Sequence, residues 1–332
     1  MKSSITKFQS PNKSQSPKSN NQWFGPLIIV SLVIVWSLLI GHWSFSFATA
    51  KEYDGVWFLG FNQHHTLFSD ENGKLVRQAV AIAVDRDKIA KKIVGDDVVP
   101  VGVIPPGMEG YDPTLNPIPH DYALAKKLMR SAGYPLYDER LKQISFLVTD
   151  GEKTKLIVDE IKRDLINIGF NITVTTVKYS NKQEWEKALT SDKYDMFVMG
   201  YKAGSVGEIF IADKSTGLFH TFTCPNNTTN EADQAYFDRY SDAVSAGFSP
   251  DPACKPEPEK PATTLGLVHP LFYTRENANV THFQNKRVDI LIEELSVLDE
   301  KLQASRKDKF EEIGRIVQEE VPIVPLFYIT RL

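Results

Sequence analysis

The sequence predicts an α/β protein: a parallel-rich sheet flanked by helices, preceded by one N-terminal transmembrane helix or signal sequence. Two observations support this. Between residues 144 and 200, extended apolar runs alternate with segments whose apolar residues recur at helical spacing. Strands and helices joined by short connections favour parallel pairing with right-handed crossovers. Near the N-terminus, a long apolar run follows a lysine-containing leader, and the 332 residues leave room for a large domain behind it.

The N-terminal region divides into a polar tail and an apolar segment. Residues 1–22 carry lysines and no acidic residue, and we expect a cytoplasmic tail there. Residues 23–47 form a transmembrane anchor or signal segment. Its most apolar part, Leu27–Ile40, is shorter than the ~20 residues that cross a bilayer, but residues 41–47 supply the missing length. Because the lysines precede the segment, the chain after Lys51 is expected outside the cytoplasm.

Two interpretations of this segment stay open. Ala48-Thr49-Ala50 is a possible cleavage site and the short apolar core suits a signal peptide, whereas the long polar leader favours an uncleaved anchor. Under either interpretation, the rest of the chain is exported from the cytoplasm. The expected location is therefore the inner membrane, with the main domain, residues 51–332, in the periplasm or another extracytoplasmic space.

The first part of the main domain has clear element boundaries. Val56–Phe61 is extended, and apolar spacing predicts a helix over Lys74–Val84. Asp85 caps a second predicted helix that Gly95 ends. Residues 99–120 are rich in proline and glycine and form an irregular loop. The next helix runs from an Asp121 cap to Gly133.

The middle of the domain alternates between strand and helix. Strands are predicted at Ile144–Val148, Phe170–Val177 and Tyr194–Gly200. The first helix carries apolar residues at helical spacing and stops at Gly169, and a shorter one contains Trp185. This is the pattern from which the α/β assignment follows.

The last third contains an insertion and two helices. Residues from about 219 to 267 are rich in asparagine and proline and predict a mostly irregular insertion, with a short helix near Ala235–Ala246. Apolar stripes then predict one helix around Val288–Leu295 and another around Phe310–Val317. Two prolines make Val321–Tyr328 extended.

The only two cysteines lie in the insertion. Cys224 and Cys254 are 30 positions apart, and in an exported protein such a pair favours a disulfide. The bond would stabilise the fold by roughly 3–4 kcal/mol. A zinc site would need more ligands at short spacing than His220 and His269 supply. We therefore expect a disulfide, with no metal site and no cofactor.

Other functional classes find little support. The net charge is −4 and no basic block follows the N-terminal tail, which argues against nucleic-acid binding. His64 and His65 are adjacent on an extended segment, so their side chains point to opposite sides and indicate surface or packing roles. The glycines at 204 and 207 lack the lysine of a phosphate-binding loop. No set of side chains suggests an enzyme.

Several blocks of the chain resemble the family 5 extracellular solute-binding proteins of ABC importers, the peptide and oligopeptide binders and their relatives. They occur in the family's order and together cover most of residues 55–330. The blocks are Phe61-Asn62, Val76–Ala79, Ala83–Arg86, Ile104–Gly107, Gly110-Tyr111, Ala125–Leu128, Ala132–Pro135, Ile168-Gly169, Tyr194-Asp195, Asn285–Ile292 and Val321–Leu326.

The resemblance implies a periplasmic-binding-protein-like lobe of the type II, peptide-binder class. Family members are usually longer and close two lobes around their ligand. The blocks here begin at the strand that, by resemblance, leads from the first lobe into the second, and they end at the strand that leads back. The chain therefore resembles a second lobe with its hinge strands.

The resemblance also places a candidate ligand site. Peptide-binding members carry an aspartate just after a strand that ends in Gly-Trp, where it pairs with the peptide's amino group. In this chain that position falls on or near Gly204, and the nearby acid is Glu208. Leaving a buried ammonium unpaired costs several kcal/mol, which argues against the family's usual capture of a free peptide. The expected ligand-binding residues are Asn62, Tyr201, Gly204, Glu208 and Tyr328.

The function implied is the extracytoplasmic substrate-binding component of an ABC-type peptide importer, in a truncated single-lobe form. Its partners would be the permease subunits, a small peptide or other solute, and a separately encoded first lobe. The alternative is a membrane-anchored protein-interaction lobe, or a split-gene remnant, without transport activity. The ligand itself cannot be derived from the resemblance, because this scaffold accepts chemically different solutes.

Overall fold

The computed structural model describes residues 51–204, 210–221, 224, 231–237, 239–256, 258 and 262–331. The expected transmembrane or signal segment, residues 23–47, lies outside these residues. Among the helices in the described ranges, none is long and apolar enough to cross a membrane. Residues Lys51–Leu332 form a unit separate from Met1–Ala50.

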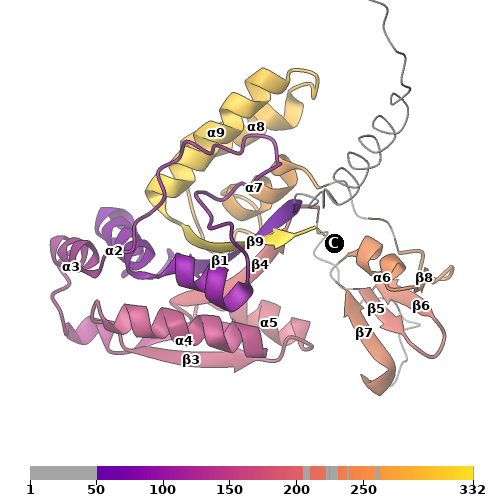
Figure 1. Ribbon diagram of the computed structural model, residues 1–332, viewed down its shortest axis with the longest axis horizontal. Coiled ribbons are helices and arrows are strands. Elements are labelled where there is room, and N and C mark those ends of the chain that lie inside the picture. The colour runs from indigo at the N-terminus through magenta and orange to yellow at the C-terminus, as the bar shows by residue number, and fades with distance from the viewer. Residues whose placement is uncertain are drawn as a thin grey trace, which may run out of the picture. The chain divides into compact units, whose positions relative to one another are not determined.

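The main sheet has five strands in the order β3-β2-β4-β1-β9 (Figure 1). The strands are β1 (Tyr53–Phe61), β2 (Ile144–Thr149), β3 (Ile172–Val177), β4 (Met196–Lys202) and β9 (Ile323–Thr330). Strand β2 pairs in parallel with β3 and β4, through the crossover helices α4 (Glu152–Ile166) and α5 (Lys182–Leu189). This parallel half is the one that the alternating sequence pattern predicted.

The other half of the sheet is antiparallel. Strand β1 pairs antiparallel with both β4 and β9, so the sheet is mixed and only partly fits the parallel-rich expectation. Strand β9 is an edge strand among the described residues and contains Pro325. Proline is tolerated there because an edge strand can leave one backbone position without a donor.

Helices cover both faces of the sheet and create two cores (Figure 1). One core takes Leu59 and Phe61 from β1, and the other takes Val56 and Phe58, because successive side chains point to opposite faces. The first core includes residues of α2 (Asp70–Ala83), α3 (Tyr122–Ser131) and α4. The second includes residues of α7 (Thr264–Phe272), α8 (Lys286–Val297) and α9 (Gln303–Glu320).

The predicted helix boundaries have identifiable chemical causes. The carboxylate of Asp121 accepts hydrogen bonds from the backbone N–H groups of Ala123 and Leu124, which confirms the predicted cap. Asp85 likewise accepts a bond of 2.9 Å from the N–H of Lys88. The helix that follows, η1 (Lys88–Val94), is a π-helix instead of the expected α-helix, and it ends at Gly95 in the left-handed conformation.

Two buried arginines fasten irregular backbone to the helices. The Arg77 guanidinium donates to the carbonyls of Phe68, Glu320 and Val321. Arg86 donates to the carbonyls of residues 100 and 118, which brings together both ends of the predicted proline-rich loop. Burial lowers the pKa of each arginine to about 10, so both stay charged at neutral pH.

The insertion is more ordered than its composition suggests. It forms a four-stranded sheet in the order β7-β5-β6-β8, with β5 (Phe210–Asp213), β6 (Leu218–Thr221), β7 (Gln234–Phe237) and β8 (Ser249–Pro250). A 3₁₀ turn (Glu231–Asp233) and helix α6 (Tyr240–Ser245) complete it. Phe210, Ala212, Phe219 and Ala243 form a small core of its own. We call residues 210–258 the inserted module.

Candidate functional site

Three strand termini meet at one end of the main sheet. Strand β1 begins there and β4 and β9 end there, with Gly55 opposite Lys202 and Tyr53 opposite Thr330. The insertion also leaves and returns at this point, because a Cβ built on Gly266 would lie 3.4 Å from the backbone nitrogen of Gly204. We call this place the strand-end region. It contains Tyr201, Gly204 and Tyr328, three of the residues predicted to bind ligand.

A buried ion pair links the inserted module to the strand-end region. Arg239 Nη1 lies 2.6 Å from Asp54 Oδ2, and the Arg239 Nη2 donates to the carbonyl of Ala203 at 2.7 Å. Both side chains are almost fully buried. Within the described part of the chain, Asp54 Oδ1 and Arg239 Nε have no hydrogen-bond partner. Lys202 and Asp242 add a second, longer pair at 3.6 Å.

Tyr201 and Tyr328 lie on either side of Val56, one strand away on each side. The hydroxyl of Tyr328 donates to the carbonyl of Gly102 at 2.9 Å, so this residue packs the loop against the sheet. Burial raises the pKa of Tyr201 to about 12, and burial also raises the pKa of Tyr328. Both are therefore neutral hydroxyl groups at physiological pH. Tyr201 is only half-buried, so it is the better placed of the two to meet a ligand.

Trp57 belongs to the opposite face of the sheet. Its ring stacks on Phe327 at 5.6 Å between centroids with an angle of 12° between planes. Gly200 faces it, and a Cβ at that position would lie 2.4 Å from the indole nitrogen. Trp57 and Tyr201 therefore pack in different cores and cannot line one cleft.

Asn62 lies at the other end of β1, beyond the Phe61–Met196 pair. Its amide donates to Asp192 Oδ1 and to the carbonyl of Tyr194, both at 3.2 Å. Since a strand rises about 3.3 Å per residue, Asn62 is roughly 20 Å along β1 from Val56, beside which Tyr201 lies. The structure does not bring Asn62 into the strand-end region. Glu208, the fifth predicted residue, lies outside the described residues.

Beside Asn62 is a cluster that the sequence reasoning missed. The rings of His64 and His282 stack at 3.6 Å, and each has a nitrogen 3.2 Å from Asp192 Oδ1. Burial lowers the pKa of His282. His65 places Nδ1 2.7 Å from Asp195 Oδ1 and Nε2 2.7 Å from the carbonyl oxygen of Asp192. The two adjacent histidines lie in a turn and not on the expected extended segment, so both reach Asp192 instead of pointing to opposite sides.

The pH behaviour of His65 follows from that contact. Burial opposes its charged form and is the largest single effect, but the contacts with Asp195 and Asp192 together outweigh burial and raise the pKa of His65. Nothing in the sequence marks this cluster, because its members come from three segments, around residues 64, 192 and 282, that are far apart in the chain.

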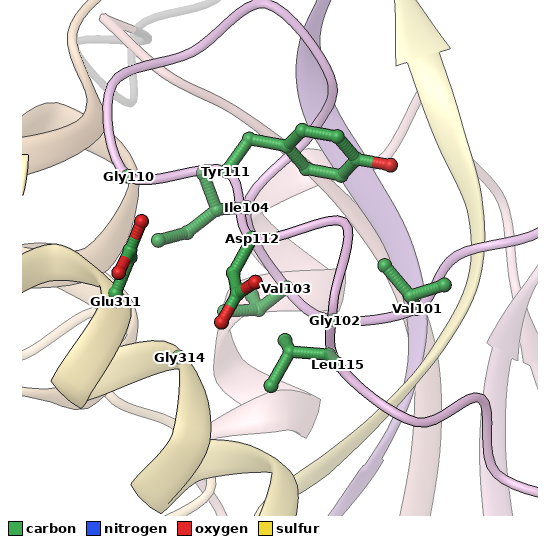
Figure 2. A pocket seen from close by; sticks show the side chains of 10 residues that line it. All are labelled: Val101, Gly102, Val103, Ile104, Gly110, Tyr111, Asp112, Leu115, Glu311 and Gly314. Carbon is green, nitrogen blue, oxygen red and sulfur yellow. The ribbon is translucent and has the colours of Figure 1, made fainter.

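A small cavity of about 10 Å³ lies between the loop of residues 101–115 and helix α9 (Figure 2). Its lining includes Tyr111, Asp112 and Glu311. Thr114 donates to Asp112 from both its hydroxyl and its backbone N–H, which lowers the pKa of that carboxyl. A volume of roughly 10–15 Å³ is needed to hold one water molecule, so this cavity is far too small for a peptide.

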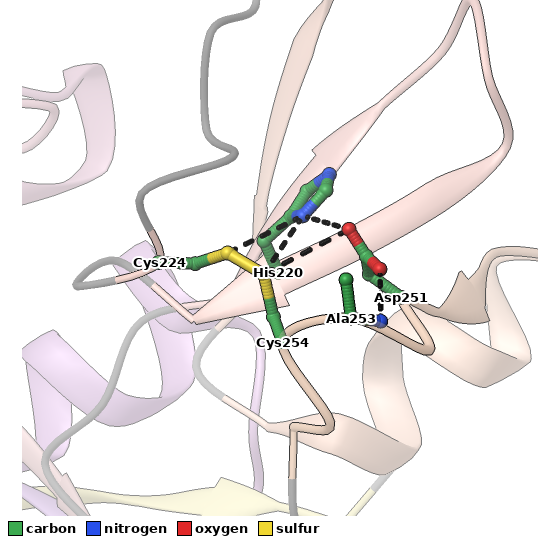
Figure 3. Close-up of a disulfide and its surroundings, with 5 residues drawn as sticks. All are labelled: His220, Cys224, Asp251, Ala253 and Cys254. Carbon is green, nitrogen blue, oxygen red and sulfur yellow. Dashed lines mark hydrogen bonds and ion pairs between the residues drawn. A yellow bond between two sulfur atoms is a disulfide. The ribbon is translucent and has the colours of Figure 1, made fainter.

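The inserted module contains the most buried cluster of metal-ligand residue types in the described part of the chain. Cys224 and Cys254 form a disulfide, and His220 and Asp251 lie directly beside it (Figure 3). His220 Nδ1 is 2.8 Å from Asp251 Oδ2, 3.6 Å from Cys254 Sγ and 3.9 Å from Cys224 Sγ. Sequence reasoning missed Asp251. The sequence did indicate Asp251 as a further ligand, because Asp251 precedes Cys254 at a short spacing, as His220 precedes Cys224.

His269, the other histidine considered as a metal ligand, lies elsewhere. His269 follows the inserted module in the chain, and its Nδ1 is 3.4 Å from Glu276 Oε1. The fourth side chain near the sulfurs is thus a carboxylate instead of a second imidazole.

A mixed sheet covered by helices on both faces, with its first strand (β1) and last strand (β9) paired side by side, is the architecture of a periplasmic-binding-protein lobe. The family model for bacterial extracellular solute-binding proteins, family 5 Middle, matches residues 41–210, about half of the chain. The chain belongs to this family. A second model, the metal binding domain of Ada, matches residues 197–257, which contain most of the inserted module.

The chain is also similar to a curated relative, Di/tripeptide-binding protein 2 of Pseudomonas aeruginosa (strain UCBPP-PA14). The two are 25% identical over 234 residues, which are 67% of this chain and 42% of the relative. This chain therefore spans less than half the length of that protein.

Solved structures show the same fold. The periplasmic binding protein DppA from Helicobacter pylori, in complex with the peptide STSA, has a TM-score of 0.57 and 16% identity, over 84% of this chain and 43% of that one. The oligopeptide-binding protein AppA from Bacillus subtilis, in complex with a nonapeptide, has a TM-score of 0.56 and 16% identity, over 84% and 45%. The Escherichia coli murein tripeptide binding protein MppA has a TM-score of 0.57 and 15% identity, over 90% and 46%.

Proposed function

We propose that residues 51–332 are the extracytoplasmic ligand-binding lobe of an ABC-type peptide importer, with a binding role and not a catalytic one. The observation that carries the proposal is the position of β1 and β9. They pair antiparallel and have their outer ends together in the strand-end region. Two strands that enter and leave a lobe side by side suit a hinge to a partner lobe.

The relatives support a peptide or similar solute as ligand. The curated relative is named for di- and tripeptide binding, and two of the solved structures hold peptides. The groups that would meet the ligand are Tyr201 and Gly204 in the strand-end region, together with Glu208, which lies outside the described residues. Tyr328 would not contact the ligand but would hold the loop at Gly102 against the sheet, through the hydrogen bond from its hydroxyl to the Gly102 carbonyl. Asn62 would contact ligand only at the other end of β1, away from the strand-end region.

The lobe would bind weakly without a partner lobe. Gly204 has a left-handed backbone and no side chain, so this position offers no carboxylate to a peptide's ammonium group. With one lobe, a ligand exchanges hydrogen bonds to water for hydrogen bonds to protein, which yields little net free energy. Closure by a separately encoded first lobe would exclude that water and strengthen each polar contact. Permease subunits would then receive the solute.

Titration calorimetry tests this proposal with residues 51–332 and a mixture of di- to pentapeptides. We expect a Kd above roughly 100 μM, equivalent to about −5.5 kcal/mol. Binding that tightens when a candidate first-lobe protein is added would support the split binder. Micromolar binding by the lobe alone would contradict the need for a partner lobe and would show that another group replaces the missing carboxylate.

The alternative is a lobe that docks on another protein without carrying solute, or a remnant. The same strand-end region would then be a protein-binding surface. Genes beside the coding sequence separate these readings, since permease genes or a first-lobe gene favour transport. For location, we propose an N-terminal anchor or signal with the lobe outside the cytoplasm. Alkaline phosphatase fused after residue 332 should be active, and an inactive phosphatase would refute export.

A further inference from the structure

We propose that His220, Cys224, Asp251 and Cys254 form a zinc site in the reduced protein, and that the metal and the Cys224–Cys254 disulfide are alternative states of the same four side chains. Each of these residues offers one ligand atom, and the four atoms lie within 4.8 Å of one another. The site belongs to the inserted module and is independent of solute binding in the strand-end region. It replaces the expectation, from sequence, that the chain has no metal site.

Apart from the two sulfurs, which are bonded to each other and must separate on reduction, the distances between the ligand atoms suit a tetrahedral ion. Zinc bonds of about 2.3 Å to sulfur and about 2.0–2.2 Å to nitrogen or oxygen give tetrahedron edges of about 3.3–3.8 Å. His220 Nδ1 is 3.6 and 3.9 Å from the two sulfurs, and Asp251 Oδ2 is 3.7 Å from Cys254 Sγ. The edge between His220 and Asp251 is shorter, at 2.8 Å, and has to open by a few tenths of an ångström to admit an ion.

The backbone of the module holds the ligands in place. His220 lies on β6 and Asp251 directly follows β8, and these strands pair in parallel with Phe219 beside Pro250. The N–H of Asp251 also donates to the carbonyl of Phe219 at 2.9 Å. The register therefore sets the imidazole beside the carboxylate. Each cysteine follows its partner within four positions, so both sulfurs reach the same point.

Burial makes a bound ion chemically reasonable. His220, Cys224 and Asp251 are each less than a tenth exposed. The buried Asp251 carboxylate accepts from the backbone N–H of Ala253 through Oδ1, which leaves Oδ2 beside His220 to meet a cation, and a divalent ion supplies such a charge. Two cysteines with one imidazole is a soft donor set that favours zinc over calcium or magnesium. All four residues lie within 197–257, the span that matches the second family model.

The two states exclude each other because both need the same sulfur atoms. A thiol or phosphine reductant supplies two electrons, the S–S bond breaks, and two thiolates form. Zinc then binds both thiolates, the imidazole and the carboxylate, with any thiol proton released to solvent. In the opposite direction, a disulfide oxidant takes two electrons from the thiolates, the S–S bond re-forms, and the ion leaves.

Metal content of the full chain, purified in detergent, tests the proposal. After reduction with a phosphine and incubation with Zn²⁺, we expect about one equivalent of zinc by mass spectrometry of the metal. The oxidised chain should hold less than a tenth of that. With Co²⁺ in place of zinc, the reduced chain should show the intense visible bands of a tetrahedral ion and the near-ultraviolet charge-transfer band of cobalt–thiolate bonds.

Variants assign the ligands. Asp251→Ala and His220→Ala should each weaken zinc binding at least tenfold, and Cys224→Ser with Cys254→Ser should abolish it. His269→Ala is the matched control, and it should leave the stoichiometry unchanged. Far-ultraviolet circular dichroism checks folding, and the oxidised parent serves as a metal-free state without any substitution. The proposal is overturned if the reduced parent takes up no zinc, or if the double serine variant keeps one equivalent, which would direct attention to His64, Asp192 and His282.

Discussion

The buried pair of Asp54 and Arg239 should decide how firmly the inserted module is held to the lobe. Their charged atoms lie 2.6 Å apart, and the side chains are only 2% and 6% exposed. Removing one partner of such a pair leaves an uncompensated buried charge, which typically costs about 3–5 kcal/mol. Asp54→Leu or Arg239→Met should therefore lower the unfolding midpoint of residues 51–332 by on the order of 10 °C.

The double variant is the sharper test. One atom of each partner, Asp54 Oδ1 and Arg239 Nε, has no hydrogen-bond partner among the described residues, so the charges are incompletely compensated. Replacing both side chains by apolar ones should then restore most of the stability, because buried ion pairs often contribute little beyond their own desolvation. Urea unfolding of the parent, both single variants and the double variant measures the coupling.

The neighbouring ion pair of Lys202 and Asp242 provides a control for these variants. Lys202 and Asp242 are 3.6 Å apart and more exposed, so Asp242→Asn should cost roughly 1 kcal/mol or less. Hydrogen exchange locates the effect, which should be concentrated in β5, β6 and β7. The reasoning fails if Asp54→Leu is as stable as the parent within about 1 kcal/mol, or if the two single losses simply add in the double variant.

Three further predictions concern single contacts. Asp121→Ala removes a helix cap and should cost about 1 kcal/mol in urea unfolding, whereas Asp159→Ala on an exposed part of α4 should cost nearly nothing. Tyr328→Phe removes the bond to the carbonyl of Gly102 and should cost about 1–3 kcal/mol; no loss would mean that this bond is dispensable. The folded-state pKa of His65 is raised by Asp195, so its contribution is complete below the unfolded value near 6.5 and is lost as pH rises through the folded value. His65→Asn should remove that decline in stability, and an unchanged pH profile would contradict the assignment.

Local signals in the sequence predicted most of the lobe. Asp121, Gly95 and Gly133 mark helix ends through backbone chemistry that operates within a few residues. The parallel strands β2, β3 and β4 follow from a simple alternation of apolar patterns. The inserted module was harder, because its strands are only two to four residues long and periodicity has too few positions to emerge. The π-helical turn after Asp85 was likewise invisible to residue spacing alone.

The contacts across long sequence distances could not be predicted from periodicity. Asp54 and Arg239 are far apart in the chain and carry no mark that they would be buried together. Asn62 was grouped with Tyr201 because both follow motifs of the resembling family, although they lie at opposite ends of β1 and β4. His220 was considered as a metal ligand from the sequence, but Asp251 was not, although its short spacing from Cys254 repeats that of His220 from Cys224.

The antiparallel pairing of β1 and β9 also sets how the lobe responds to mechanical force. The backbone N–H of Arg331 donates to the carbonyl of Glu52, so the outer ends of the two strands are hydrogen-bonded neighbours. Antiparallel ladder bonds run across the strands, and a pull that separates these two ends loads them one pair at a time. The hydrogen bonds between the two strands would break one pair after another, from Tyr53 and Thr330 inward, and this requires only a low force. Pulling on both ends would thus uncover the edge of β1 that faces β9, and it would draw the buried side chains of both strands out of the two cores.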